Sequence, residues 1–290
     1  MKKFFFISLL AVLLLSLTSL TYAQVLWLSA ANLKQGKIIA MTEFYYSSLN
    51  KIYDTADEKW IDNPDTKSEW GFNSMIGYGI TDRFDALIHI PFRNIAFENE
   101  DGTVEKDAMG VGDIWLKSQF AVIPWSKDKN GLAFLSTISL PTGSLKDDFT
   151  LGSGRIDFAI GEIFSTKWTH NWRGHIKANY WFSQNTGGTS GKDVGDNYEV
   201  ILKIDKFFTK TAFAFVVFNY TQKWKDQTAA GIHTAWTQKS RYVIQPGITY
   251  IPKPGLFIRP KVAIPVSGEV GEMNDYKILV DVWYVFTTTK

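Results

Sequence analysis

The chain has 290 residues, a formal net charge of +2 at pH 7 and no cysteine. Residues 1–23 place two lysines before a long apolar run that ends on a small residue, which predicts a secretory signal peptide; the mature chain, residues 24–290, loses these lysines and its formal net charge falls from +2 to 0. This balance argues against a general nucleic-acid binder, and the lack of cysteine excludes disulfides and a lipoprotein anchor.

The alternative for residues 1–23 is a retained membrane anchor. No later run approaches the roughly 18 apolar residues that a membrane helix needs. Aromatic residues nevertheless make up 15% of the chain. An exported, cysteine-free and aromatic-rich chain leaves two classes of protein, a periplasmic or secreted β-sandwich and an outer-membrane β-barrel.

Along the mature chain, apolar and polar residues alternate in pieces of about ten to fourteen residues, the period of β-strands. In one piece Ile114, Leu116 and Phe120 share a face, while Asp113 and Lys117 lie on the other. No segment of useful length has a helical period. A single domain, residues 24–290, is therefore predicted, with twelve strands at 37–47, 68–80, 84–97, 112–125, 131–141, 154–168, 173–184, 197–208, 212–224, 239–251, 255–266 and 276–286.

The predicted connections alternate between short and long. A bacterial outer-membrane barrel has an even number of strands, short periplasmic turns and longer outer loops. The alternation therefore favours the barrel over the sandwich and places both termini on the periplasmic side. The long connections are predicted at 48–67, 98–111, 142–153, 185–196, 225–238 and 267–275.

Aromatic residues on the apolar faces lie toward the strand ends. Rings at both rims of an apolar band are typical of a protein that crosses two membrane interfaces. We therefore predict an all-β, antiparallel transmembrane barrel, closed because an open sheet edge in hydrocarbon would leave backbone groups unpaired. The rings are Tyr46, Trp70, Tyr180, Tyr198, Tyr220 and Tyr242 near the long loops, and Tyr78, Phe84, Tyr250, Tyr284 and Phe286 near the short turns.

Several prolines fall inside predicted strands. Proline removes a hydrogen bond from a central strand, and every strand of a closed barrel is central. Bulges or kinks are therefore expected at Pro91, Pro246, Pro260 and Pro265.

The polar face of each strand is expected to line a wet interior. One interpretation is a ladder of ion pairs that fills a narrow barrel, and the other is a selectivity lining for a solute. In the predicted strand 212–224, the face that carries the polar Asn219 also carries the apolar Phe213, Phe215 and Val217. This predicts a bulge or an apolar plug near the periplasmic end. The pore-lining residues expected to set the electrostatics are Arg93, Asp113, Lys117, Arg155, Asp157, Arg259 and Lys261.

Some outer-membrane barrels are hydrolases, so an enzyme is an alternative to a channel. Only His89 and His175, of four histidines, have inward parity, and no serine or threonine is convincingly placed beside either. The G-x-S-x-G elbow is absent, residues 151–155 lack the Lys-Ser/Thr of a phosphate loop, and no Cys or His cluster suggests a metal. No enzymatic activity, cofactor or metal is expected; a hydrolase using His89 or His175 is the less favoured alternative.

Three short motifs stand within residues 110–161. Gly-Val-Gly-Asp at 110–113 heads a predicted strand, Ser-Leu-Pro-Thr-Gly follows at 139–143, and Leu-Gly-Ser-Gly-Arg-Ile-Asp spans 151–157. Together they resemble the outer-membrane family labelled "MetA-pathway of phenol degradation", whose barrel would cover nearly the whole mature chain. The resemblance implies a barrel that admits small compounds, often aromatic or hydrophobic.

The sequence therefore predicts a channel in the outer membrane of a Gram-negative cell, for passive uptake of a small aromatic or hydrophobic solute through a narrow mixed-charge lumen. The alternative is a plugged structural or surface-interaction barrel that acts through its long loops. Expected partners are the lipid bilayer, lipopolysaccharide, the solute and the outer-membrane assembly machinery. The last predicted strand ends in aromatic residues, and this end resembles the signal that the assembly machinery recognises. Residues 24–36 are expected in the periplasm or in the lumen.

Overall fold

The computed structural model describes residues 28–54, 59–98, 103–126, 130–143, 145–146, 149–183, 196–224, 239–269 and 272–287. The predicted signal peptide lies outside these residues, and so do parts of several predicted loops. No helix within the described ranges has the length and hydropathy needed to cross a membrane.

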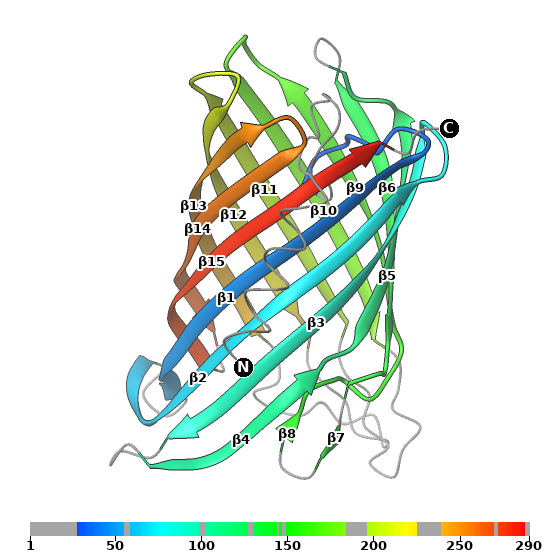
Figure 1. Cartoon of the computed structure of the whole chain (residues 1–290). Coiled ribbons are helices and arrows are strands. Elements are labelled where there is room, and N and C mark those ends of the chain that lie inside the picture. Colours follow the sequence, from blue (N-terminus) through cyan, green and yellow to red (C-terminus); the bar gives the residue numbers. More distant parts are fainter. Residues whose placement is uncertain are drawn as a thin grey trace.

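Antiparallel β-strands make up most of the described chain (Figure 1). In chain order they are β1 (Lys37–Asp54), β2 (Lys59–Gly79), β3 (Phe84–Glu98), β4 (Val104–Val111), β5 (Ile114–Ile123), β6 (Gly131–Leu140), β7 (Leu145–Lys146), β8 (Phe149–Thr150), β9 (Asp157–Lys167), β10 (Trp172–Ser183), β11 (Asn197–Phe207), β12 (Ala212–Lys223), β13 (Lys239–Lys253), β14 (Leu256–Glu269) and β15 (Glu272–Thr287).

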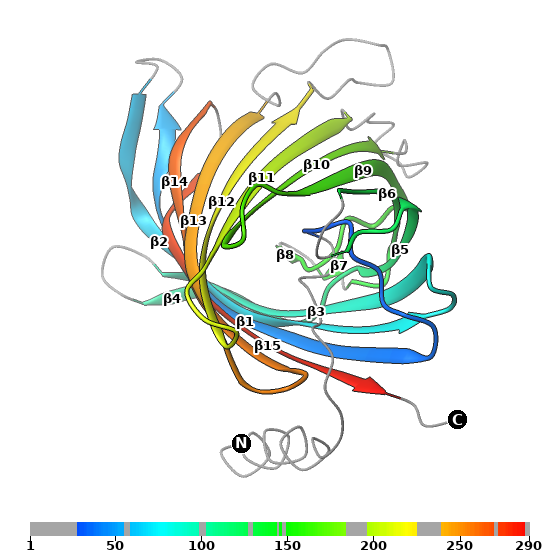
Figure 2. The ribbon, with the colours of Figure 1, turned by 90° about the horizontal axis from the view of Figure 1, so that it is seen from above.

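The main sheet has 13 strands, and all of them except β4 close into a barrel, seen along its axis in Figure 2. β1 pairs with both β2 and β15, so the last strand returns to the first. β4 pairs only with the far half of β3, and β7 and β8 form a separate small hairpin. Closure gives each barrel strand two neighbours and confirms the predicted antiparallel twelve-stranded barrel.

Both ends of the barrel sheet lie at the short-turn rim. Lys37, at the start of β1, is paired with Thr287, at the end of β15. The Gly36 amide donates to the Gly79 carbonyl (2.9 Å), beside the turn between β2 and β3. The assignment of this rim to the periplasm stays a prediction.

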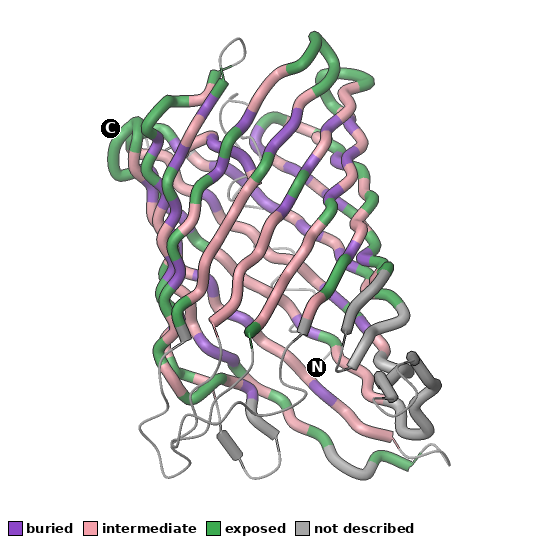
Figure 3. Tube along the Cα trace, turned by 180° about the vertical axis from the view of Figure 1, so that it is seen from behind, coloured by how far each residue is buried: buried purple, intermediate pink, exposed green. Residues whose placement is uncertain are grey.

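The two faces of the wall differ as the alternation predicted. On β6, Ala133 and Leu135 face inward and are buried, while Phe134 faces outward with 54% of its surface exposed. Large apolar side chains such as Ile160 and Ile176 are exposed around the outside, and buried and exposed residues alternate along parts of the wall in Figure 3. An apolar surface this extensive suits hydrocarbon rather than water.

All twelve predicted strands are present, but the wall extends further at the long-loop rim than predicted. β1 runs on to Asp54 and β2 begins at Lys59, so most of the predicted loop 48–67 is a strand ribbon. Likewise β4 occupies part of the predicted loop 98–111, and β15 begins at Glu272. Beyond the apolar band both faces of a strand meet water, so these extensions lack the apolar alternation by which the strands were predicted.

The prolines have two different effects. The register changes by one residue between the pairs Phe92–Val111 and His89–Trp115, so a bulge opposite Pro91 separates β4 from β5. A second register shift lies beside Pro265. By contrast, the β12–β13 and β14–β15 ladders run through Pro246 and Pro260 without a shift, so no bulge lies on those sides, while the β13–β14 ladder between the two prolines has no pair for either of them. An antiparallel ladder leaves alternate amides free on one side, where proline removes no bond.

Candidate functional site: the barrel lumen

At the short-turn end, residues 28–36 (the N-terminal segment) lie inside the barrel (Figure 2). The Ala30 amide donates to Ser165 Oγ (2.7 Å), and the Leu33 amide donates to Asp85 Oδ2 (2.9 Å). Gln119 donates from Nε2 to the Ala31 carbonyl (3.0 Å). Inward polar residues of β3, β5 and β9 thus satisfy backbone groups that would otherwise be buried without partners.

Apolar contacts hold the same segment against the wall. Ala30 packs in a cluster with Ala133, Leu135 and Ile163. Leu33 packs in a second cluster with Ile39, Phe257, Trp283 and Val285. The segment therefore occupies and narrows the lumen at this end.

Inward apolar residues of β12 complete this constriction. Phe213, Phe215 and Val217 are buried together, with Leu28 of the N-terminal segment packed against them. The β11–β12 ladder runs without a register shift. The predicted apolar plug is thus confirmed and the alternative, a bulge, is wrong.

A series of buried polar side chains, joined by hydrogen bonds, lies beside the N-terminal segment. His175 Nδ1 is 2.8 Å from Ser165 Oγ, and its Nε2 is 3.0 Å from Asp205 Oδ2. Lys203 forms an ion pair with Asp205 Oδ1 (2.5 Å). The expectation that no serine lies beside His175 is wrong, because the β9–β10 register places Ser165 directly opposite it. Because Ser165 Oγ also accepts a hydrogen bond from the Ala30 amide, these side chains link the wall to the N-terminal segment.

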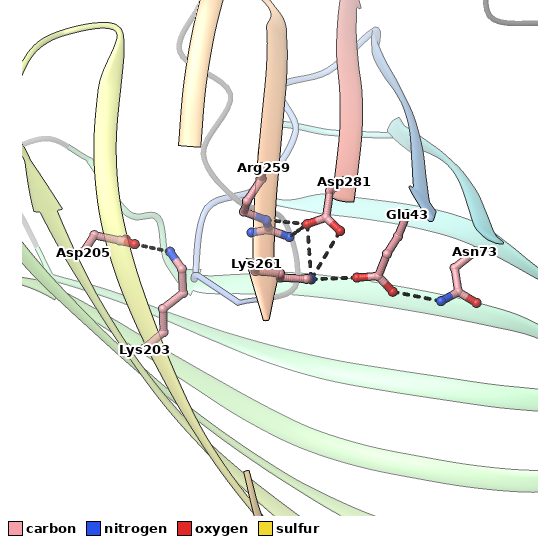
Figure 4. A network of polar contacts seen from close by, with 7 residues as sticks. All are labelled: Glu43, Asn73, Lys203, Asp205, Arg259, Lys261 and Asp281. Carbon is pink, nitrogen blue, oxygen red and sulfur yellow. Dashed lines mark hydrogen bonds and ion pairs between the residues drawn. The ribbon is translucent and has the colours of Figure 1, made fainter. Parts of the chain in front are cut away.

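A belt of ion pairs crosses β14, β15, β1 and β2 (Figure 4). Arg259 pairs with Asp281, and Lys261 Nζ lies 3.2 Å from Asp281 Oδ1 and 2.6 Å from Glu43 Oε2. Asn73 donates to the other oxygen of Glu43 (2.9 Å). The structure thus brings together the predicted residues Arg259 and Lys261, and their shared carboxylates place both in a packed structural network.

At the long-loop end, Asp113 holds the base of the loop between β6 and β9. Its Oδ1 accepts the Gly143 amide (3.0 Å) and its Oδ2 accepts the Ser153 amide (2.5 Å). Thr142 Oγ1 accepts the Ile114 amide (2.9 Å). The three motifs of residues 110–157 therefore meet at one place, and Asp113 is engaged with backbone amides rather than projecting free into the lumen.

Close packing explains the glycines in these motifs. A Cβ on Gly152 would lie 2.2 Å from Asp113 Oδ1 and 2.8 Å from Gly143 Cα. A Cβ on Gly112 would lie 2.9 Å from the Leu151 carbonyl oxygen. Side chains at these positions would force the loop base away from the strand.

We expect Gly152→Val to detach this loop while the barrel stays folded, because the strand ladders do not include Gly152. Loss of the two amide bonds to the Asp113 carboxylate removes about 1.5–3 kcal/mol each. Limited proteolysis of protein in liposomes should show faster cleavage between residues 141 and 156. Ser153→Ala keeps the backbone amide and serves as the control; equal cleavage of both variants would contradict this account.

The other predicted site residues are dispersed. Arg155 Nε pairs with Asp157 Oδ1 (2.7 Å) at the start of β9. Lys117 lies on β5 with its ammonium 4.7 Å from the centre of the Trp115 ring. Arg93 lies on β3, and its Nε is buried without a hydrogen-bond partner. The predicted set is thus distributed along the lumen rather than gathered in one site.

The prediction omitted several inward residues that shape the lumen. Ser165 and Gln119 hold the N-terminal segment, and Trp115 and Trp181 approach each other with ring centres 5.7 Å apart. All four lie on the same strand faces as the inward charged residues, so the sequence could have indicated them. They carry no net charge, however, and were not predicted as site residues.

Comparison with known proteins agrees with this geometry. A family model described as "Putative MetA-pathway of phenol degradation" matches residues 69–270. The structure of the COG4313 outer membrane channel from Pseudomonas putida F1 is similar, with a TM-score of 0.77 and 13% identity over 91% of this chain and 100% of that chain. The transport unit of the autotransporter AIDA-I from Escherichia coli has a TM-score of 0.51 and 9% identity over 92% and 94% of the two chains. The sequence matches no curated protein.

At these identities the structural likeness shows the fold, which is that of an outer-membrane β-barrel. The family match covers more than half of the chain and includes all three motifs that meet around Asp113. This bears out the resemblance drawn from residues 110–161 and places the barrel in the outer membrane of a Gram-negative cell. The chain belongs to the family described as "Putative MetA-pathway of phenol degradation".

Proposed function

We propose that this barrel is a channel for the passive uptake of a small aromatic or hydrophobic solute. The observation that carries the proposal is a closed wall whose outer face is apolar and whose inner face bears charged and aromatic side chains. Such a wall encloses a polar path through hydrocarbon. The description of the family, which names phenol degradation, supports a solute of this class, and the printed name of the Pseudomonas putida structure supports a channel.

The fold by itself does not select the cargo, because an autotransporter transport unit shares it. What supports a small solute here is the filling of the lumen. The N-terminal segment packs against the inner wall, and the belt of Glu43, Lys261, Asp281 and Arg259 also lies on it, so the narrowed path suits a small molecule better than a polypeptide.

Liposome swelling tests the channel directly. We expect the reconstituted protein to admit small phenols and amino acids faster than protein-free liposomes do, and to exclude larger sugars. Protein unfolded before reconstitution is the control. If no solute enters faster than in protein-free liposomes, the proposal fails.

Charged lumen residues are proposed to set the ion preference of the pore. Arg155→Gln leaves the Asp157 carboxylate unpaired near the long-loop end, so the reversal potential in a salt gradient should shift toward cations. Asp157→Asn is the matched variant and should shift it toward anions. Two unchanged reversal potentials would exclude this pair from the conducting path.

A plugged structural barrel is the second candidate, favoured by the position of the N-terminal segment. The two proposals differ in single-channel recordings. A folded protein with no conductance, and no solute flux in liposomes, would support a barrel that acts through its outer loops.

We infer that the barrel has no hydrolase activity. Two solved structures with a similar fold are a channel and an autotransporter transport unit. In the Ser165–His175–Asp205 chain all three side chains are buried, and Ser165 already accepts the Ala30 amide. A nucleophile needs access to its substrate, which this serine lacks.

We propose two further partners from the membrane location. Lipopolysaccharide would surround the outer rim, and the assembly machinery would recognise β15, which ends in the neighbouring rings of Tyr284 and Phe286. Loss of outer-membrane insertion in a Phe286→Ala variant would test the second partner.

A further inference from the structure

Just inside the long-loop end, two indole rings meet across the inner wall. Trp115 on β5 and Trp181 on β10 have ring centres 5.7 Å apart and planes inclined at 61°. Strands β6 and β9 run between them in the sheet. These strands present the small side chains of Thr137, Ser139 and Ala159 at this level, and so leave room for the rings to approach over them.

A histidine with unused hydrogen-bonding capacity borders this pair. His89 is directly opposite Trp115 in the β3–β5 ladder, and its ring meets the Trp115 ring edge to face, with centres 4.9 Å apart. Only 6% of its surface is exposed, and neither ring nitrogen has a hydrogen-bond partner among the residues that the structure describes. A buried imidazole usually satisfies its nitrogens, so this one is available to a bound molecule.

The same place carries a cation without a carboxylate partner. Lys117 lies two residues from Trp115 on the same face, with its ammonium 4.7 Å from the indole centre. No carboxylate of the described chain lies within ion-pair distance of it, whereas Lys203, Arg259 and Lys261 each have one. The ammonium is therefore free to pair with an anionic group of a solute.

We propose that His89, Trp115, Lys117 and Trp181 form a transit site for a small aromatic carboxylate. The indoles supply faces and edges on which a planar ring packs. Lys117 supplies the charge for the carboxylate, and His89 supplies a hydrogen bond. The inference rests on the proposed channel function, and it deepens that function by assigning both the solute class and the residues that select it.

Benzoate is the test ligand, compared with neutral benzyl alcohol and with non-aromatic cyclohexanecarboxylate. Binding to the purified full-length protein is measured by calorimetry. We expect Lys117→Met to weaken benzoate binding about tenfold or more, because a charge-assisted bond is lost, and to leave benzyl alcohol binding unchanged. Trp181→Leu should reduce the preference for benzoate over cyclohexanecarboxylate about fivefold, by removing ring packing.

Lys206→Met is the matched control. Lys206 also lies over an indole, 4.5 Å from the centre of Trp172, but on the outer face of the wall. This variant should bind benzoate as the unaltered protein does. Each variant is first shown to be folded by its urea unfolding midpoint.

The outcomes separate the site from the channel. Unchanged benzoate binding in folded Lys117→Met and Trp181→Leu, or no benzoate binding at all, would overturn the site, while solute flux in liposomes would still support the channel. If benzoate binding depends on Lys117 and Trp181, the site is supported even when no solute enters the liposomes. Absence of solute flux would overturn only the proposed channel function.

Discussion

Replacing Asp281 with leucine is expected to lower the free energy of unfolding by about 3–5 kcal/mol, the usual effect of leaving one member of a buried ion pair without its partner. Asp281 is fully buried and pairs with both Arg259 and Lys261. Without it, the guanidinium of Arg259 stays buried with no carboxylate. Urea unfolding followed by tryptophan fluorescence measures the change.

Two comparisons make this result specific. Lys177→Met breaks a longer and more exposed contact with Glu199 (3.7 Å) and leaves the hydrogen bonds of Glu199 to Asn179 and Asn219 in place, so it should lower stability by less than about 1 kcal/mol. The double variant Arg259→Met with Asp281→Leu replaces the pair by apolar side chains and should recover part of the loss. A double variant no more stable than Asp281→Leu, or an Asp281→Leu variant as stable as the unaltered protein, would show that the belt is not an interdependent network.

Replacing residues 28–33 with a glycine–serine linker of equal length is expected to raise single-channel conductance severalfold. The linker removes the side chains of Ala30 and Leu33, which seat this segment in two apolar clusters. Glycine also increases the conformational freedom that the bound state must lose. The segment should therefore leave the lumen for part of the time and open the short-turn end.

Ser165→Ala provides a graded comparison, since it removes the bonds of Ser165 to the Ala30 amide and to His175 but leaves both apolar clusters in place. It should raise conductance less than the linker does. If the linker variant is folded and its conductance equals that of the unaltered protein, the N-terminal segment does not restrict the conducting path.

The sequence predicted the strands well wherever one face of a strand contacts hydrocarbon and the other contacts water. Alternation identified all twelve barrel strands, and on one of them it placed Leu116 on the apolar face and Lys117 on the polar face, because one face of each strand must be apolar. It missed β4 and the outer part of the β1–β2 ribbon, since water bathes both faces of a strand beyond the membrane and no alternation is required there.

The sequence predicts which side chains face the lumen, but not which of them contact each other. Parity places Arg259 and Asp281 inside, yet their contact depends on the β14–β15 register. Likewise, Ser165 meets His175 only because the short connection between β9 and β10 sets their alignment. The approach of Trp115 to Trp181 spans two intervening strands, so it depends on the curvature of the whole wall and on small residues between the rings.

The central claim is that each barrel strand has one face in hydrocarbon and the other along a wet lumen, and single cysteines along β10 test it most directly. The chain has no cysteine of its own, so each substitution gives one reactive thiol. In liposomes, a charged, water-soluble thiol reagent should label cysteine at 177, 179 and 181 and spare cysteine at 176, 178 and 182. Equal labelling of the two sets, or labelling of the second set alone, would contradict it.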